Sequence, residues 1–317
     1  MRRVLCALLA AGGLAAAEVP AAEPAAAPAQ PGPFAGGKPA GKLLSGNDGA
    51  VFVIAPDGQV AWKHASHGFV TDASFLPNGN ILYSADSHAA EVTPDQRIVF
   101  QYDLAERAGG GIYSCQRLAN GNTLVAENST GRLREIAPDG KTVVFELKLP
   151  DMTPGQHYNM RVARKLANGN YLVAHTGRRM AREYAPDGRI VWEQTAPDGA
   201  EHLFVAIRQP DGHTLLSTYR AIYEYTADHR LVWTFAREDF PPGKHLGVFC
   251  GLQLLPNGHL VVAVYQTYDQ AGNGVGLFEI DRKKRVVWSY ASPATSPINP
   301  TVHLLVAGRP RGADPTR

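Results

Sequence analysis

Apolar residues along most of this chain fall in short runs separated by turn sequences, a pattern that predicts β-strands rather than long helices. Residues 111–147 show this pattern most clearly. Asn120-Gly121 is typical of a two-residue hairpin, and Pro138-Asp139-Gly140 is a second turn signal. The stretch is therefore predicted to form a four-stranded antiparallel meander, with strands at 112–118, 123–127, 133–136 and 142–147.

The hairpin turn of this meander occurs in five copies. The glycines of the copies lie between 42 and 48 residues apart, which is the period of one four-stranded propeller blade. The repeat predicts a ring of blades, and its turn glycines are Gly79, Gly121, Gly169, Gly212 and Gly258.

An acidic residue in the third strand and an aromatic residue in the fourth strand also recur. Because the aromatic position occurs six times, we expect an all-β fold: a six-bladed β-propeller with four-stranded antiparallel blades. Residues 301–306 supply a lone first strand, and residues 42–63 supply the three strands it lacks. A velcro closure is therefore expected, in which the C-terminal strand pairs with the N-terminal strands. The recurring residues are expected to be structural: Glu91, Glu135, Glu183, Glu224 and Glu279, and Trp62, Phe100, Phe145, Trp192, Trp233 and Trp288.

The N-terminal residues do not follow the repeat. Arg2 and Arg3 precede an apolar run that ends in small residues, so residues 1–17 are predicted to be a signal peptide of a secreted or periplasmic protein. The run is too short to span a membrane. Residues 18–41 are rich in Ala, Pro and Gly and are predicted to be a disordered linker. The propeller is expected at 42–306 and a tail at 307–317.

The charge of the chain limits its partners. The sequence has 31 Lys and Arg against 29 Asp and Glu, and the predicted signal peptide contains two of the basic residues and no acidic one. A neutral mature chain without a basic run gives no reason to expect nucleic acid as a partner, and we expect a monomer. Cys115 and Cys250 are predicted on opposite inner strands, too far apart for a disulfide, as buried free thiols.

The candidate site is expected on one face of the ring. The connections between second and third strands, and between blades, are longer and less regular than the Asn-Gly turns, and binding residues concentrate on such loops. Histidines recur where the chain enters the inner strands. The catalytic candidates are His157, His202, His245 and His303, and the ligand-binding candidates are His67, Asp72, Tyr113, Glu127, Asn159, Arg161, His175, Arg178 and Arg220.

These side chains allow several kinds of chemistry. Imidazole can act as nucleophile, acid, base or metal ligand, and guanidinium matches sulfate, phosphate or carboxylate oxygens. A divalent metal stays possible, since Asp72, Glu127 and Glu201 offer carboxylates. Pyrroloquinoline quinone (PQQ) is not expected, because no calcium loop is evident.

The repeat also carries a family resemblance. Its Leu-x-Asn-Gly-Asn turn, third-strand Glu and Val-Val-Trp motif resemble the six-bladed propellers of the arylsulfotransferase-like group and, more loosely, PQQ-like repeat proteins. His157-Tyr-Asn159 and His175-Thr-Gly-Arg178 are similar to two segments of the former group. The resemblance implies transfer of a sulfuryl group from an aryl sulfate to a phenol, with His157 and Asn159 contacting the group and Arg178 stabilising its charge. It leaves the nucleophile open among His202, His245 and His303.

Four functions follow, in order of preference. The first is an exported binding protein with a His- and Arg-rich site over the central channel, for a small anionic or carbohydrate ligand or for a protein partner. The second is arylsulfotransferase-like group transfer through a channel histidine. The third is a metal-dependent carbohydrate-active lyase or hydrolase, and a quinone dehydrogenase comes last.

Overall fold

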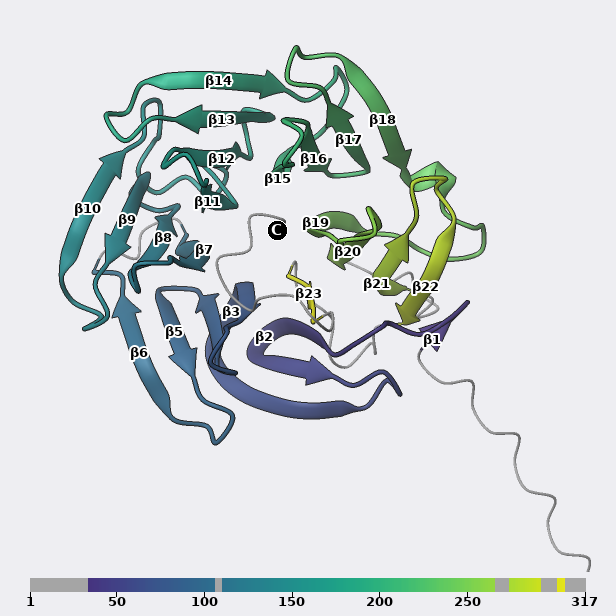
Figure 1. Ribbon diagram of the computed structural model, residues 1–317, viewed down its shortest axis with the longest axis horizontal. Helices are drawn as coiled ribbons and strands as arrows, with labels where there is room; N and C mark the ends of the chain where they lie inside the picture. The colour runs from purple at the N-terminus through teal and green to yellow at the C-terminus, as the bar shows by residue number, and fades with distance from the viewer. Residues whose placement is uncertain (1–33, 106–109, 266–273, 292–300, 306–317) are drawn as a thin grey trace, which may run out of the picture. The chain divides into compact units, whose positions relative to one another are not determined.

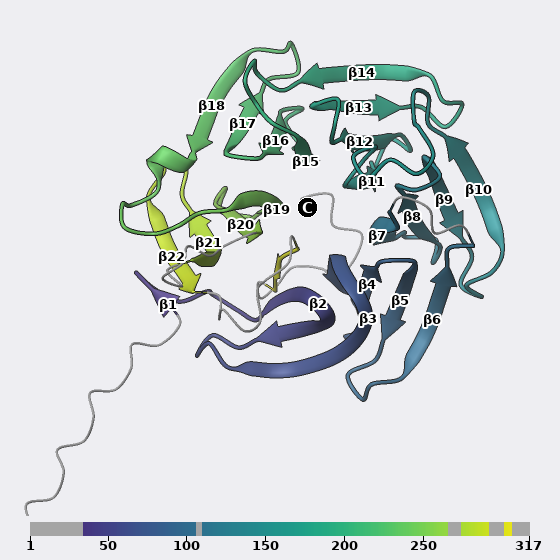
Figure 2. The same ribbon diagram turned by 180° about the vertical axis from the view of Figure 1, so that it is seen from behind.

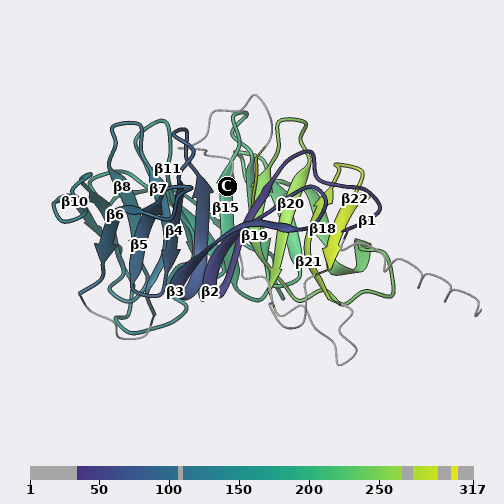
Figure 3. The same cartoon turned by 90° about the horizontal axis from the view of Figure 1, so that it is seen from below.

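The computed structural model describes residues 34–105, 110–265, 274–291 and 301–305, which form an all-β propeller with its sheets placed around a common centre (Figure 1). The view from behind shows the same arrangement (Figure 2). From the side, the strands run between two faces at which the connecting loops gather (Figure 3). None of the described residues forms a helix long and apolar enough to cross a membrane.

Three of the sheets are four-stranded antiparallel meanders, as the sequence predicts, with the first strand of each nearest the centre. The first contains β7 (Ile112–Arg117), β8 (Thr123–Glu127), β9 (Arg132–Ile136) and β10 (Val143–Lys148). The second contains β11 (Ala163–Lys165), β12 (Tyr171–His175), β13 (Met180–Tyr184) and β14 (Ile190–Thr195). The third contains β15 (Leu203–Arg208), β16 (Thr214–Thr218), β17 (Ala221–Tyr225) and β18 (Leu231–Ala236), and a 3₁₀ turn at Arg237–Asp239 follows it.

A fourth sheet has an additional outer strand from the N-terminal region. Its members are β19 (Val248–Leu254), β20 (Leu260–Tyr265), β21 (Val275–Ile280), β22 (Val286–Ala291) and β1 (Phe34–Ala35). The ring of Phe34 lies 5.7 Å from that of Trp288 and 5.1 Å from that of Tyr290. The linker predicted at 18–41 therefore ends too late, because Phe34 is a large apolar side chain that packs on the blade. Residues 1–33 and 306–317, with the predicted signal peptide and tail, lie outside the described residues.

The fifth sheet shows that the predicted number of blades is wrong. It has six strands: β23 (His303–Leu304), β2 (Leu43–Ile54), β3 (Val60–Phe75), β4 (Ile81–Ala85), β5 (His88–Val92) and β6 (Ile98–Asp103). The residues up to Phe69 in β3 pair with β2, and the residues from Val70 pair with β4. No turn separates the two halves of this 16-residue strand, so two predicted blades share one sheet and the described structure has five sheets, not six.

The C-terminal strand β23 contacts two sheets. It pairs with β2 through Leu43↔Leu304 and Leu44↔His303. On its other side, the Gln253 side chain of β19 donates to the carbonyl of Leu304 at 3.2 Å and accepts from its N–H at 2.7 Å. Residues 301–305 thus lie between the six-stranded sheet and β19.

The recurring glutamates have the structural role that the sequence predicts. The Glu91 carboxylate accepts hydrogen bonds from the side chains of Asn78 and Asn80 in its own turn. It also binds Arg117 of the next sheet at 2.6 Å, and that guanidinium lies 4.8 Å from the ring centre of Phe100. Arg208 and Arg282 make the same pair of contacts, each with a glutamate and a tryptophan of the preceding sheet. Lys165 also binds the glutamate of the preceding sheet, Glu135, but lies over the ring of Tyr171 in its own sheet.

Candidate functional site

A cavity of about 480 Å³ lies where the chain enters the inner strands, at the ends predicted to carry the irregular loops. Its wall is largely aromatic, and the aromatic residues come from all five sheets and their loops. This volume falls in the range of small-molecule sites. The aromatic lining residues are Phe69, Tyr113, Tyr158, Phe204, Tyr219 and Tyr265.

Arg161 is the cation of this cavity. The loop before β11 carries it, and its backbone N–H donates to the carbonyl of Ala174 at 3.0 Å, which aligns this loop with β12. Its side chain is deep, because the residue is only 8% exposed. The buried Nε has no hydrogen-bond partner among the described residues, and the guanidinium carbon lies 4.7 Å from the ring centre of Tyr113.

Tyr113 and His157 form a polar pair beside this arginine. The Tyr113 hydroxyl lies 2.5 Å from Nδ1 of His157. Burial raises the pKa of Tyr113, although Arg161 opposes the rise. Partial burial of the imidazole, followed by the charges of Arg161 and His202, lowers the pKa of His157. At neutral pH the pair is therefore a phenol and an uncharged imidazole. One proton lies between them, and one further N–H or O–H donor is left for a ligand.

The mouth of the cavity has a flat aromatic platform. The rings of Tyr158 and His202 stack with their centres 4.4 Å apart and an interplanar angle of 18°. His202 adopts a left-handed backbone with φ of 42°, immediately before β15. Since Tyr158 is 49% exposed, its outer face is open to a planar ligand.

Cys250 and Val248 of β19 form part of the apolar lining. Cys250 is 3% exposed, and burial raises the pKa of its thiol to about 12. Cys115 and Cys250 are both buried thiols, which confirms the prediction that they form no disulfide with each other. The thiol of Cys250 is therefore protonated and acts as a small apolar group.

Of the residues predicted for the site, four line the cavity: Tyr113, His157, Arg161 and His202. Histidines and arginine were recognised because their types suit ligand chemistry. The other aromatic lining residues were not selected, although each lies near the entry to an inner strand or after a second strand. The signal in the sequence that identifies them is the position of these aromatic residues at the loop ends of the strands in the repeat.

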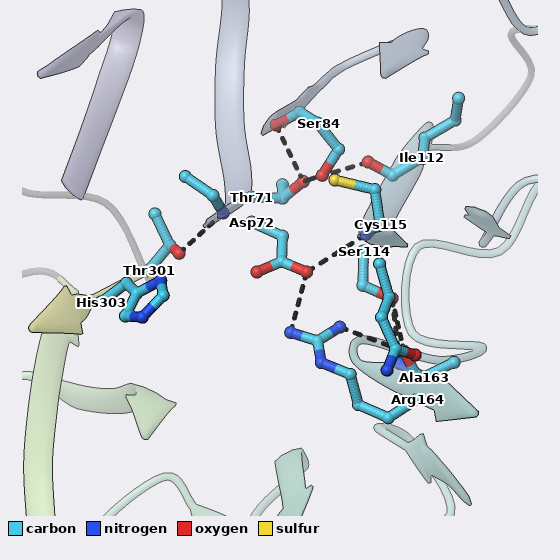
Figure 4. Close-up of polar contacts among 12 residues, drawn as sticks. Thr71, Asp72, Ser84, Ile112, Ser114, Cys115, Ala163, Arg164, Thr301 and His303 are labelled. Carbon is cyan, nitrogen blue, oxygen red and sulfur yellow. Dashed lines mark hydrogen bonds and ion pairs between the residues drawn. The ribbon is translucent and has the colours of Figure 1, made fainter. Parts of the chain in front are cut away.

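Asp72 and His303 lie lower along the inner strands and have protein partners (Figure 4). Asp72 is 4% exposed, pairs with Arg164 at 2.9 Å and accepts from the backbone N–H of Cys115 at 3.1 Å. Nδ1 of His303 accepts from the backbone N–H of Phe75 at 3.1 Å. Both side chains were expected to contact a ligand, but Asp72 and His303 instead connect the inner strands to one another.

Glu127 and Asn159 are also buried away from the cavity lining. The Glu127 carboxylate receives hydrogen bonds from Tyr102 and Thr130 and an ion pair from Arg134. The Asn159 side chain bonds to backbone groups of its own loop and to the carbonyl of Asn128 at 3.0 Å. Both groups were expected to face a ligand, and both instead stabilise loops between neighbouring sheets.

The remaining predicted residues do not line the cavity. Arg178 and Arg220 are exposed and approach Asp151 and Glu201 at 3.9 Å and 3.8 Å. His67 is exposed on β3 in a left-handed backbone with φ of 52°, and the His245 carbonyl accepts from the N–H of Val275 at 3.2 Å. The histidines at the entries to the inner strands therefore do not all line one site. His157 and His202 line the cavity, whereas the other three lie at different levels of the ring.

No group of three or more His, Cys, Asp or Glu side chains within the described ranges is placed to hold a metal ion. Gly111 is closely packed against the turn after β4: a Cβ on Gly111 would lie 1.8 Å from the carbonyl oxygen of Asp86.

His175 is fully buried and makes the protein sensitive to acid. Its Nε2 lies 2.9 Å from the Tyr184 hydroxyl, and its Nδ1 has no partner among the described residues. Burial, followed by the charges of Arg182 and Arg178, lowers the pKa of His175 to about 3. The imidazole therefore remains neutral in the folded protein.

We expect replacement of His175 by Gln to flatten the acid side of the stability profile. Between about pH 6.5 and pH 3 the unfolded state binds a proton at this position and the folded state does not. The free energy of unfolding therefore falls by about 1.4 kcal/mol for each unit that the pH decreases. Urea unfolding of both proteins between pH 6.5 and pH 3 measures the effect. The wild-type slope should exceed the His175→Gln slope by about that amount, and equal slopes would contradict the assignment.

No protein-family model matches the chain, and a comparison with curated proteins finds no match. Solved structures show the same fold. A protein of unknown function from Bacteroides caccae is 23% identical with a TM-score of 0.70, over 82% of this chain and 97% of that one. Virginiamycin B lyase from Staphylococcus aureus is 12% identical with a TM-score of 0.55, over 80% and 84%. Likeness at these identities shows the β-propeller fold alone.

Proposed function

We propose that this protein binds a small anionic ligand with a planar body in the aromatic cavity. The observation that carries the proposal is Arg161, a buried guanidinium in the cavity wall without a hydrogen bond to its Nε. A buried cation that lacks a counter-charge destabilises a protein. Such a group is retained where a ligand supplies the missing charge.

The surroundings of Arg161 favour a planar anion. A guanidinium presents several N–H donors in a fixed fork that matches carboxylate, sulfate or phosphate oxygens. Tyr113 and the neutral His157 can add hydrogen bonds without adding charge. The stacked Tyr158 and His202 rings offer a flat surface for the rest of the molecule.

Titration calorimetry with matched aryl ligands tests the proposal. We expect p-toluate, p-toluenesulfonate or p-tolyl phosphate to bind, and the neutral p-toluamide to bind far more weakly. Charge-assisted hydrogen bonds contribute about 1.5–3 kcal/mol, so Arg161→Gln should weaken anion binding by about 10- to 100-fold. Arg220→Gln is the matched control, because that arginine is exposed and paired with Glu201.

Two outcomes of this titration would count against the proposal. One is equal affinity for the anions and for p-toluamide. The other is tight binding of a neutral sugar with no binding of any anion, which would favour the carbohydrate ligand considered from the sequence.

A second candidate is group transfer of the arylsulfotransferase kind through His157. It is favoured by the position of this uncharged imidazole in the cavity together with Arg161. The resemblance also implies roles for Asn159 and Arg178, but these side chains bind protein groups in the structure and so do not support group transfer. Turnover of p-nitrophenyl sulfate with phenol, lost in His157→Ala, would select this function over binding alone.

We further propose that the protein is exported and that β23 closes the ring. Export is supported by Arg2, Arg3 and the apolar run after them. Ring closure is supported by the pairing of β23 with β2 and by the Gln253 contacts on its other side.

A further inference from the structure

Asp86 brings a negative charge to the same cavity. It follows β4, adopts a left-handed backbone with φ of 43° and lines the cavity from its exposed side. Its N–H donates to the carbonyl of Phe69 at 3.3 Å, and its carbonyl accepts from the N–H of Ile112 at 2.7 Å. These bonds tie Asp86 to the inner strands β3 and β7 on either side of it.

Two glycines allow this placement. A Cβ on Gly68 would lie 2.5 Å from the Asp86 carboxylate oxygen Oδ2, and a Cβ on Gly111 would meet the Asp86 backbone. The Asp86 carboxylate therefore packs directly over the backbone of Gly68. Its location is set by neighbouring strands and not by a flexible loop.

Asp86 and Arg161 do not neutralise each other. Both line one cavity, and no ion pair of either residue is found in the part of the chain that the structure describes. Arg161 lies deep at 8% exposure, whereas Asp86 lies at the exposed side. Two opposite charges that line one cavity without forming an ion pair leave the space between them to a ligand.

We infer that the ligand is an aromatic zwitterion, with its acidic group on Arg161 and a basic amine on Asp86. The inference rests on the anion binding proposed above and narrows it. A simple anion would satisfy Arg161 but would share the cavity with the uncompensated carboxylate of Asp86. A zwitterion satisfies both charges, and its planar body stacks on the Tyr158 and His202 platform.

The test compares ligands that differ only in the amine. We expect p-(aminomethyl)benzoate to bind more tightly than p-toluate, or p-(aminoethyl)benzoate more tightly than p-ethylbenzoate, where the spacing suits the cavity. For a partly exposed ion pair the advantage should be about 1.4- to 5-fold. Asp86→Asn should remove the advantage, and Asp103→Asn, an exposed carboxylate next to Gln101, should keep it.

The outcomes separate this inference from the proposal beneath it. If p-toluate binds and neither amine improves affinity, or if Asp86→Asn keeps the amine advantage, the zwitterion is ruled out and anion binding stands. If p-toluate, p-toluenesulfonate, p-tolyl phosphate and the amino acids all fail to bind the wild-type protein, the proposed function itself is overturned.

Discussion

A chain that ends at residue 300 should lose most of its folded population, whereas a chain that ends at residue 305 should fold. Both lack residues 306–317, so the comparison isolates the strand formed by residues 301–305. Val302 and Leu304 are 3% and 1% exposed in one core cluster. Losing two such side chains costs roughly 5 kcal/mol or more, comparable to the whole stability of many domains.

Hydrogen bonds add to this loss. The backbone N–H groups of Ala73 and Phe75 donate to Thr301 and His303, at 3.1 Å each, and would lose these acceptors. Urea unfolding followed by tryptophan fluorescence measures the difference. In the full chain, Leu304→Ala should cost about 2–5 kcal/mol. Equal unfolding midpoints for the two truncated chains would contradict ring closure by β23.

Replacing Arg161 with Met should stabilise the empty protein. Replacing buried charges by apolar side chains of similar size commonly adds about 1–4 kcal/mol, and the lost contact with the Tyr113 ring offsets part of this gain. Such a gain raises the thermal midpoint by several degrees in a chain of this size. The same variant should lose anion binding, which is the usual conflict between stability and function.

Arg164 provides a matched control three positions along the chain. It is 4% exposed, but its guanidinium pairs with Asp72 at 2.9 Å. Arg164→Met leaves that carboxylate buried without this cation and should lower stability by about 3–5 kcal/mol. If Arg161 is unpaired, differential scanning calorimetry should show a higher thermal midpoint than wild type for Arg161→Met and a lower one for Arg164→Met. A loss of stability in both would show that Arg161 is structural.

The β-propeller fold was largely predictable because each repeat contains the turn sequences and the short apolar runs of a four-stranded meander. Gly121 and its equivalents mark hairpins through local backbone chemistry, and glutamates such as Glu91 recur because they bind their own turn and the next sheet. The number of sheets was not predictable, since the local sequence of residues 66–69 does not show that Phe69 pairs with Asp48 of β2 and that β3 continues into the next hairpin. Phe34 was misassigned for a similar reason, because its partner Trp288 is far along the chain.

The candidate site was only partly predictable. His157 and Arg161 were found because their side-chain types suggest chemistry, whereas His303 and Asp72 share those types and are satisfied by protein groups. Whether a polar side chain faces the cavity or a neighbouring strand depends on how far its loop extends into the ring. The alignment of the repeats does not predict this. Asp86 was missed because it lies in a short turn whose exposure only the packed inner strands define.

The proposed anion-binding group of the cavity is Arg161. A crystal structure of the protein with the tightest-binding anion of the aryl panel tests this role. We expect density for the acidic group within hydrogen-bonding distance of the Arg161 guanidinium and an aromatic ring against Tyr158. An anion bound only at exposed arginines such as Arg178, with Arg161 uncontacted, would contradict it.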